Sequence, residues 1–90
     1  MYNYLVEFVA SAFVTYVVFA TANPLAIGFA HAFALLLTQK ISEGHVNPVV
    51  PIVMTAIDKM SLDKLLGYIF AQIFGGFVGY QIFIKYRIPV

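Results

Sequence analysis

The 90-residue chain has no cysteine and no tryptophan, and it has few charges. Without cysteine, the sequence excludes a disulfide framework, thiolate catalysis and a thiolate metal site. Charged residues make up 10% of the chain and the formal net charge is +1, so nothing favours nucleic acid or an acidic partner. Hydrophobic residues make up 62%, and the mean hydropathy is +0.92. A soluble domain needs far more polar surface, so the composition predicts an integral membrane protein in a lipid bilayer.

The apolar residues form runs of two lengths. Three runs are expected as transmembrane helices, at about residues 5–22, 25–39 and 62–84, although the second is short for a span. A fourth run, at about residues 47–57, is roughly ten residues long and covers about half of the hydrocarbon core. We expect that run to be a half-helix that re-enters the bilayer. The expected fold is an all-α, multi-pass membrane domain of residues 1–90, with three transmembrane helices and one re-entrant half-helix.

Asn47 and Pro48 stand at the start of the expected half-helix. Asparagine is a preferred N-cap, and proline is well tolerated at the first helical position. A half-helix that begins inside the bilayer points its unpaired N–H groups and its positive dipole end into the membrane. Such an end lines a pore or binds an anion. The alternative interpretation is a plain cap for a buried helix.

Polar side chains interrupt the long runs at regular places. Glu7, Ser11 and Thr15 are spaced four residues apart, so they share one helix face, which we expect to turn away from lipid. His31 lies in the middle of the second run, where a polar side chain is costly and usually functional. Gln72 is the central polar residue of the last run, and we expect it to pack and hydrogen-bond between spans.

Gly75 and Gly79 form a GxxxG pattern in the last run, which predicts close helix packing within or between chains. The sequence contains no paired carboxylates, nucleophile–base set, phosphate-binding loop or metal-ligand cluster. It therefore predicts a protein that is not an enzyme and has no cofactor. The N-terminus lacks a basic region and a small-residue cleavage site, so we do not expect a removable signal peptide.

Four segments, in order, resemble the N-terminal half of the aquaporin, or major intrinsic protein, family. Residues 7–10 (EFVA) resemble the entry to its first helix, and residues 23–28 (NPLAIG) resemble the link to its second helix. Residues 44–49 (GHVNPV) resemble its half-helix loop, and residues 71–72 (AQ) with the glycines after them resemble its third helix. The segment around His31 (AHAFAL) is most similar to the tonoplast intrinsic subgroup, which carries a histidine at this position.

The resemblance implies a channel for water and small neutral solutes. In this family two inverted repeats each supply three spans and one half-helix, and the half-helices meet at the membrane midplane. By resemblance, the residues that line the pore are Asn47, Pro48, Val49 and His31. Glu7 and His45 would brace the re-entrant loop through hydrogen bonds.

The chain carries one such repeat, so a complete pore needs a second one. We expect a homo-oligomer, for which an inverted dimer is one arrangement, or a second half-channel chain. Lys40, Lys59 and Lys64 would lie on one side of the membrane and Lys85 and Arg87 on the other, and this weak bias permits both orientations.

The alternative is a truncated channel that no longer conducts and serves as a membrane anchor or assembly protein. The segment between His31 and Asn47 is about four residues, or one helical turn, shorter than the family pattern, which favours this alternative. Glu43, in place of a family glycine, and Pro51, inside the half-helix, favour it too.

Overall fold

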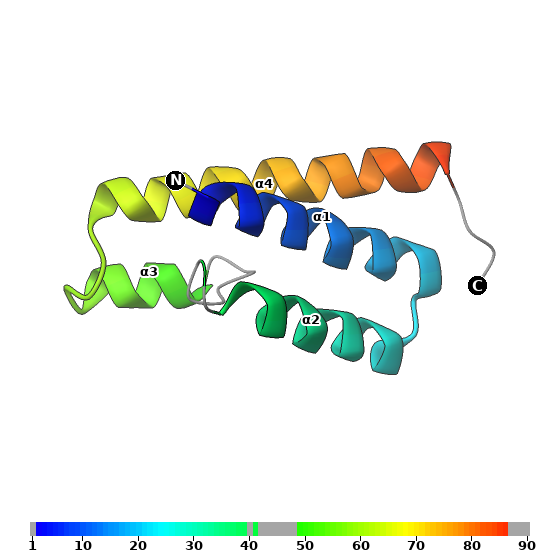
Figure 1. The fold of residues 1–90 in the computed structure, drawn as a ribbon, viewed down its shortest axis with the longest axis horizontal. Coiled ribbons are helices and arrows are strands. Elements are labelled where there is room, and N and C mark those ends of the chain that lie inside the picture. Colours follow the sequence, from blue (N-terminus) through cyan, green and yellow to red (C-terminus); the bar gives the residue numbers. More distant parts are fainter. Residues whose placement is uncertain (1, 40, 42–48, 87–90) are drawn as a thin grey trace.

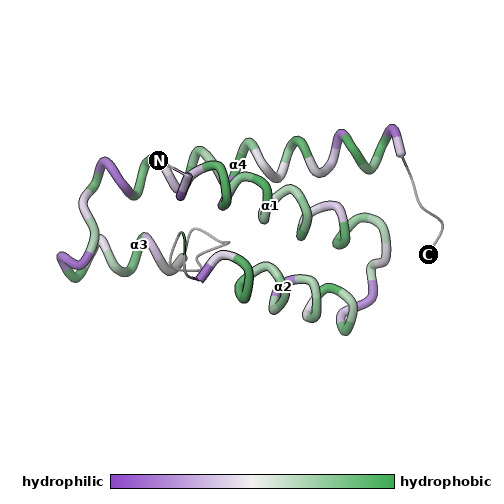
Figure 2. The backbone as a smooth tube through the Cα atoms, viewed as in Figure 1, coloured by the Kyte–Doolittle hydropathy of each residue, from purple (hydrophilic) through white to green (hydrophobic). Residues whose placement is uncertain are grey.

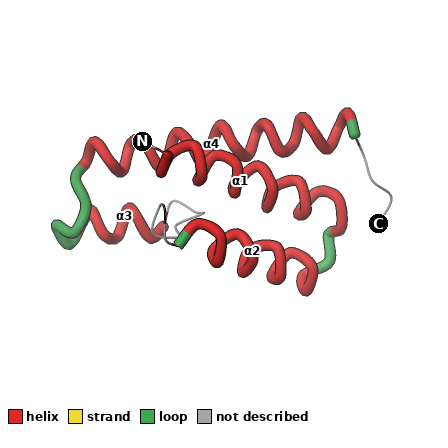
Figure 3. Tube along the Cα trace, viewed as in Figure 1, coloured by secondary structure: helices red, strands yellow, loops and turns green. Residues whose placement is uncertain are grey.

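A computed structural model describes residues 2–39, 41 and 49–86 of the chain, and these residues form four helices. The helices are α1 (Tyr2–Thr21), α2 (Pro24–Thr38), α3 (Val49–Ala56) and α4 (Leu62–Lys85). α1 and α4 lie side by side along their lengths, while α2 and α3 follow one another along the same side of that pair (Figure 1). α2 packs against α1, and α3 packs against α4. Short turns join α1 to α2 and α3 to α4 (Figure 3).

Two of the four helices are long and apolar enough to cross a membrane, namely α1 with 20 residues and α4 with 24. At 1.5 Å per residue they measure about 30 and 36 Å, which matches a hydrocarbon core of about 30 Å. α2 has 15 residues and α3 has eight, so they measure about 22 and 12 Å. The described residues thus contain two candidate spans where the sequence predicted three, because α2 falls short of the core thickness.

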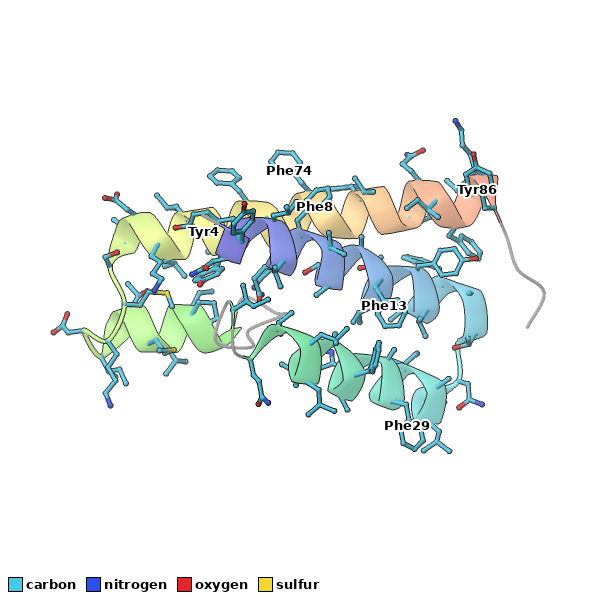
Figure 4. All side chains as sticks on the ribbon, viewed as in Figure 1. Tyr4, Phe8, Phe13, Phe29, Phe74 and Tyr86 are labelled. Atoms are coloured by element: carbon cyan, nitrogen blue, oxygen red, sulfur yellow. The ribbon has the colours of Figure 1, made fainter. Side chains whose placement is uncertain are left out.

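The surface of the described bundle is apolar between its two ends. Polar residues gather at the turn between α1 and α2, at the turn between α3 and α4, and at the end of α4 (Figure 2). Large exposed side chains cover the helix shafts, among them Phe29 on α2 and Phe74 on α4 (Figure 4). This distribution suits a bundle whose sides face lipid and whose ends face water.

The turn between α1 and α2 is fixed by local hydrogen bonds. Ala22 adopts a left-handed conformation (φ 52°) and donates its N–H to the carbonyl of Val18, which ends α1 with an αL motif. Asn23 then caps α2, because its Oδ1 accepts from the N–H groups of Leu25 (2.9 Å) and Ala26 (3.3 Å). Pro24 at the first helical position needs no N–H partner. The turn therefore reverses the chain within two residues.

A second left-handed residue ends α3. Asp58 (φ 62°) donates its N–H to the carbonyl of Thr55, and Lys59 donates to the carbonyl of Met54, which together form a Schellman motif. Aspartate tolerates this conformation better than most residues. Ser61 then caps α4 by accepting from the N–H of Lys64 at 3.3 Å.

We predict that Asn23→Ala destabilises the folded chain by about 1 kcal/mol, because the first N–H groups of α2 lose their acceptor. Chemical unfolding in detergent micelles, followed by circular dichroism, measures the change. Asn23→Asp is the matched control, since aspartate caps as well as asparagine. Equal stability of Asn23→Ala and the parent chain would contradict the role of this cap.

Candidate functional site

α1 and α4 approach so closely that their contact leaves no room for side chains at two positions of α4. A Cβ atom added to Gly75 would overlap the carbonyl oxygen of Phe8, and one added to Gly79 would overlap that of Ala12. From the first contact to the second, the residue numbers rise along both helices, from Phe8 to Ala12 and from Gly75 to Gly79, so α1 and α4 run parallel. Glycine permits this approach because it has no Cβ, and in membranes such contacts supply much of the packing energy between helices.

The glycine contact sets the register that brings Glu7 against Gln72. Gln72 Nε2 donates a hydrogen bond of 3.0 Å to Glu7 Oε1, between residues 65 positions apart in the sequence. The Glu7 side chain is fully buried and Gln72 is 7% exposed. A buried carboxylate needs hydrogen-bond donors, and the amide of Gln72 supplies one of them from the neighbouring helix.

Two further polar atoms lie buried in α1 and α4. Ser11 Oγ, one helical turn after Glu7, and Gln72 Oε1 are both buried, and neither has a hydrogen-bond partner in the described part of the chain. Thr15, one turn further along α1, places its Oγ1 beside Gly76 of α4. A row of polar groups on α1 therefore runs along the flank of α4.

Tyr68 is a buried member of the same α4 face that sequence reasoning missed. Its side chain is completely buried, and its hydroxyl accepts a hydrogen bond of 3.3 Å from Asn3 Nδ2. The ring of Tyr4 meets it edge to face, with 5.2 Å between ring centroids. Tyr68 precedes Gln72 by four residues, and this helical spacing was the signal that could have identified it.

His31 lies half-buried on α2. It adjoins the stripe Ala30, Ala34 and Thr38, whose members are all buried. In the described residues no hydrogen bond links His31 to Glu7 or Gln72. The small side chains of this stripe let α2 pack against α1, where Ala10 and Ala34 form a buried cluster.

α3 carries part of the predicted pore lining. Val49 is its first residue, although the position of the Val49 side chain is not described. Asn47, Pro48 and His45 lie outside the described residues. Pro51 is fully buried in the first turn of α3, where helical N–H groups have no intrahelical acceptor and none is lost. No group of three His, Cys, Asp or Glu that could hold a metal occurs in the described segments.

Comparison with known proteins identifies the family. The model of the major intrinsic protein family matches residues 21–89, which is most of the chain. The chain belongs to the major intrinsic protein family. It is therefore an integral membrane protein, as its composition predicted, and the match includes α2, α3 and α4.

Curated relatives match over short segments. The chain is 44% identical over 52 residues to a "Probable glycerol uptake facilitator protein" of Thermotoga maritima, covering 58% of this chain and 22% of that protein. It is 42% identical over 52 residues to an "Aquaglyceroporin" of Plasmodium falciparum, covering 58% and 20%. It is 34% identical over 57 residues to a "Lens fiber major intrinsic protein" of Gallus gallus, covering 63% and 22%. The chain thus matches about a fifth of the length of these relatives. No solved structure matches the chain.

We predict that Gly75→Ala and Gly79→Ala each destabilise the chain by about 1–3 kcal/mol, because the added methyl group forces α1 and α4 apart. Unfolding in detergent measures the loss. Gly28→Ala is the matched control, since nothing lies within 4 Å of a Cβ at that helical position. The control should stabilise α2 by about 0.5–1 kcal/mol. Similar effects at all three glycines would show that α1 and α4 do not pack through Gly75 and Gly79.

We also predict that Gln72→Leu costs about 1–3 kcal/mol, because the buried Glu7 loses a hydrogen-bond donor. Gln81→Leu, at an exposed position of the same helix, should change stability by less than about 0.5 kcal/mol. The same unfolding measurement compares the two variants. Equal tolerance of leucine at both positions would mean that the Glu7–Gln72 hydrogen bond contributes nothing to stability.

Proposed function

We propose that this chain is one half of an aquaporin-like channel that conducts water and small neutral solutes once a second repeat completes it. Family membership is the observation that carries the proposal, because the matched region contains the Asn47–Pro48 pair followed by α3. An eight-residue apolar helix is too short to span a bilayer, and it packs against α4. Members of this family are channels, so we assign the chain no reaction.

The proposed domain is a single repeat of residues 1–90. In it, α1, α2 and α4 serve as the three transmembrane helices, and α3 is the membrane-inserted part of the re-entrant half-helix. The names of relatives such as the Thermotoga protein favour glycerol among the neutral solutes. The proposal also includes a resemblance to the tonoplast intrinsic subgroup, in which His31 corresponds to the histidine that the subgroup carries at this position.

The proposed roles of the side chains follow from the half-helix. Asn47, Pro48 and Val49 line the pore where the positive end of α3 orients passing water. His31 lines the pore at a second level. Glu7, fixed in place by Gln72, braces the re-entrant loop together with His45. The hydrogen bond between Gln72 and Glu7 supports this role, because it holds the carboxylate inside the bundle.

The alternative function that we propose is that of a non-conducting membrane anchor or assembly protein. The observation that favours it is that α1 and α4 are long and apolar enough to cross a membrane, which is all that an anchor requires. A single half-helix encloses no pore. The two functions differ in one measurable property, which is the water permeability of membranes that contain the chain.

We predict that proteoliposomes containing the chain shrink in hypertonic medium faster than empty liposomes, measured by light scattering. Asn47→Asp should abolish the increase, because a carboxylate replaces the amide that orients water. His31→Phe should lower or alter it by changing the pore lining. Asn23→Asp is the matched control, because it makes the same change at the other Asn-Pro pair, where the side chain caps α2.

Shrinkage no faster than that of empty liposomes, with insertion of the chain verified, would contradict conduction by this chain and favour the anchor. Equal shrinkage rates for the parent and Asn47→Asp would contradict the proposed pore lining even if the membranes were permeable.

A further inference from the structure

α1 and α4 run in the same direction, so the chain has to cross back between them. Each of the two helices is long and apolar enough to cross a membrane. When both span the bilayer, the residues between them must include one crossing in the opposite direction. α2 has 15 residues and measures about 22 Å, which is less than the hydrocarbon core of about 30 Å. α2 alone therefore falls short of that crossing.

The glycine contacts give the relative depths of α1 and α4. Gly75 and Gly79 meet the α1 residues that precede them by 67 positions (75 − 8 and 79 − 12). Because the two helices are parallel, the same offset makes Val6 level with Ile73. Ile73 is eleven residues after the first residue of α4 (73 − 62) and twelve before the last (85 − 73). Val6 therefore lies at the mid-depth of α4.

α2 ends at that mid-depth. Ala34 packs against Ala10, and further along α2 the residues Leu37 and Thr38 line one groove with Val6 of α1. α2 thus runs antiparallel to α1 and ends beside its first turns. Since Val6 is level with the centre of α4, the last residues of α2 are level with it too. A helix that crossed the whole membrane would instead end beside the first residues of α4.

α3 covers the remaining depth. Its Met54 packs against a buried cluster that includes Leu65 and Tyr68, which belong to the first two turns of α4. The short turn after α3 makes it antiparallel to α4, so α3 runs in the same direction as α2 (Figure 1). Ile52 and Val53 of α3 are exposed and apolar, as suits a lipid-facing helix. α3 therefore continues the direction of α2 along the other half of α4.

We propose that α2 and α3 together form a single membrane crossing, which is interrupted at the mid-depth of α4. The 15 residues of α2 and the eight of α3 measure about 34 Å together, close to the 36 Å of α4. In the proposed repeat, α2 is then the first part of the middle span and α3 is the second part. The inference depends on membrane insertion, which family membership shows, and not on conduction.

A crossing that is broken at this depth places two helix ends inside the bilayer. The last carbonyl groups of α2 and the first N–H groups of α3 have no intrahelical partners. Gln39, which follows α2 directly, adds an exposed polar side chain. Such groups occur at membrane depth only where they are buried in protein or line a water-filled cavity. A plain anchor needs no such break, so the arrangement favours the channel over the anchor.

Distances between two spin labels on one chain test the depth at which α2 ends. The parent chain has no cysteine, so pairs of cysteines can be labelled selectively. Leu37→Cys is paired with Leu62→Cys in one variant and with Ile84→Cys in another. The three side chains are exposed, at 60%, 62% and 42%, so the labels disturb little packing. Double electron–electron resonance is recorded in liposomes with an excess of unlabelled parent chain, which limits the signal to distances within one molecule.

The broken crossing predicts two similar distances. Leu62 and Ile84 each lie eleven residues from Ile73 (73 − 62 and 84 − 73), which is about 16 Å along the helix. With Leu37 at the depth of Ile73, the two mean distances should differ by less than about 8 Å, or one and a half helical turns. A larger difference would place the end of α2 near one end of α4 and overturn the proposal.

A second set of distances tests whether α3 continues α2. Leu25→Cys, at the start of α2, is paired with Leu37→Cys in one variant and with Ile57→Cys, directly after α3, in another. The first pair lies within α2 and is the matched control, with a separation of about 18 Å along the helix. The second distance should be longer by about 12 Å, the length of α3. Equal distances would mean that α3 lies beside α2, and they would overturn the single crossing.

The outcome is separable from that of the proposed function. A broken crossing in membranes that show no added water permeability would retain this inference and reject the channel. Permeable membranes in which Leu37 lies level with Leu62 would retain the channel and reject the inference.

Discussion

The close contact between α1 and α4 is the constraint on which the rest of the structure depends. Gly75 and Gly79 allow the backbone of α4 to touch the carbonyl groups of Phe8 and Ala12. In a bilayer no hydrophobic force drives helices together, so such packing must hold the parallel pair. The contact also fixes the register in which Gln72 meets Glu7. α2 packs against α1 and α3 packs against α4, so both short helices depend on the geometry of the α1–α4 pair.

That constraint connects packing to the proposed function through the buried carboxylate. Glu7 lies fully buried in a membrane helix, where a carboxyl group needs hydrogen-bond donors, and Gln72 of the neighbouring helix donates to it. The Oε1 atom of the same amide is buried as well, without a hydrogen-bond partner in the described residues. Loosening the glycine contact would therefore disturb the packing of α1 against α4 and the Glu7–Gln72 hydrogen bond together.

The spacing of residues within each helix predicted which helix faces are buried, but not which residues of other helices pack against them. Composition identified a membrane protein and the four quoted segments identified its family, and the family match confirms both. The GxxxG spacing marked Gly75 and Gly79, yet nothing in the sequence specified Phe8 and Ala12 as what they meet. Periodicity repeats within one helix, whereas the register between helices 65 residues apart depends on side-chain packing in three dimensions. Helical spacing could have placed Tyr68 on the same face as Gln72, but its contacts with Asn3 and Tyr4 depend on the register between α1 and α4.

Solid-state NMR of the isotope-labelled chain in lipid bilayers tests the central contact most directly. Through-space carbon–carbon correlations should join the Cα of Gly75 to the carbonyl carbon of Phe8, and the Cα of Gly79 to that of Ala12. Their presence in parent chain diluted with unlabelled copies would establish the parallel α1–α4 pair within one molecule. Correlations from both glycines to lipid acyl chains, with none to α1, would contradict the contact and the position of Gln72 derived from it.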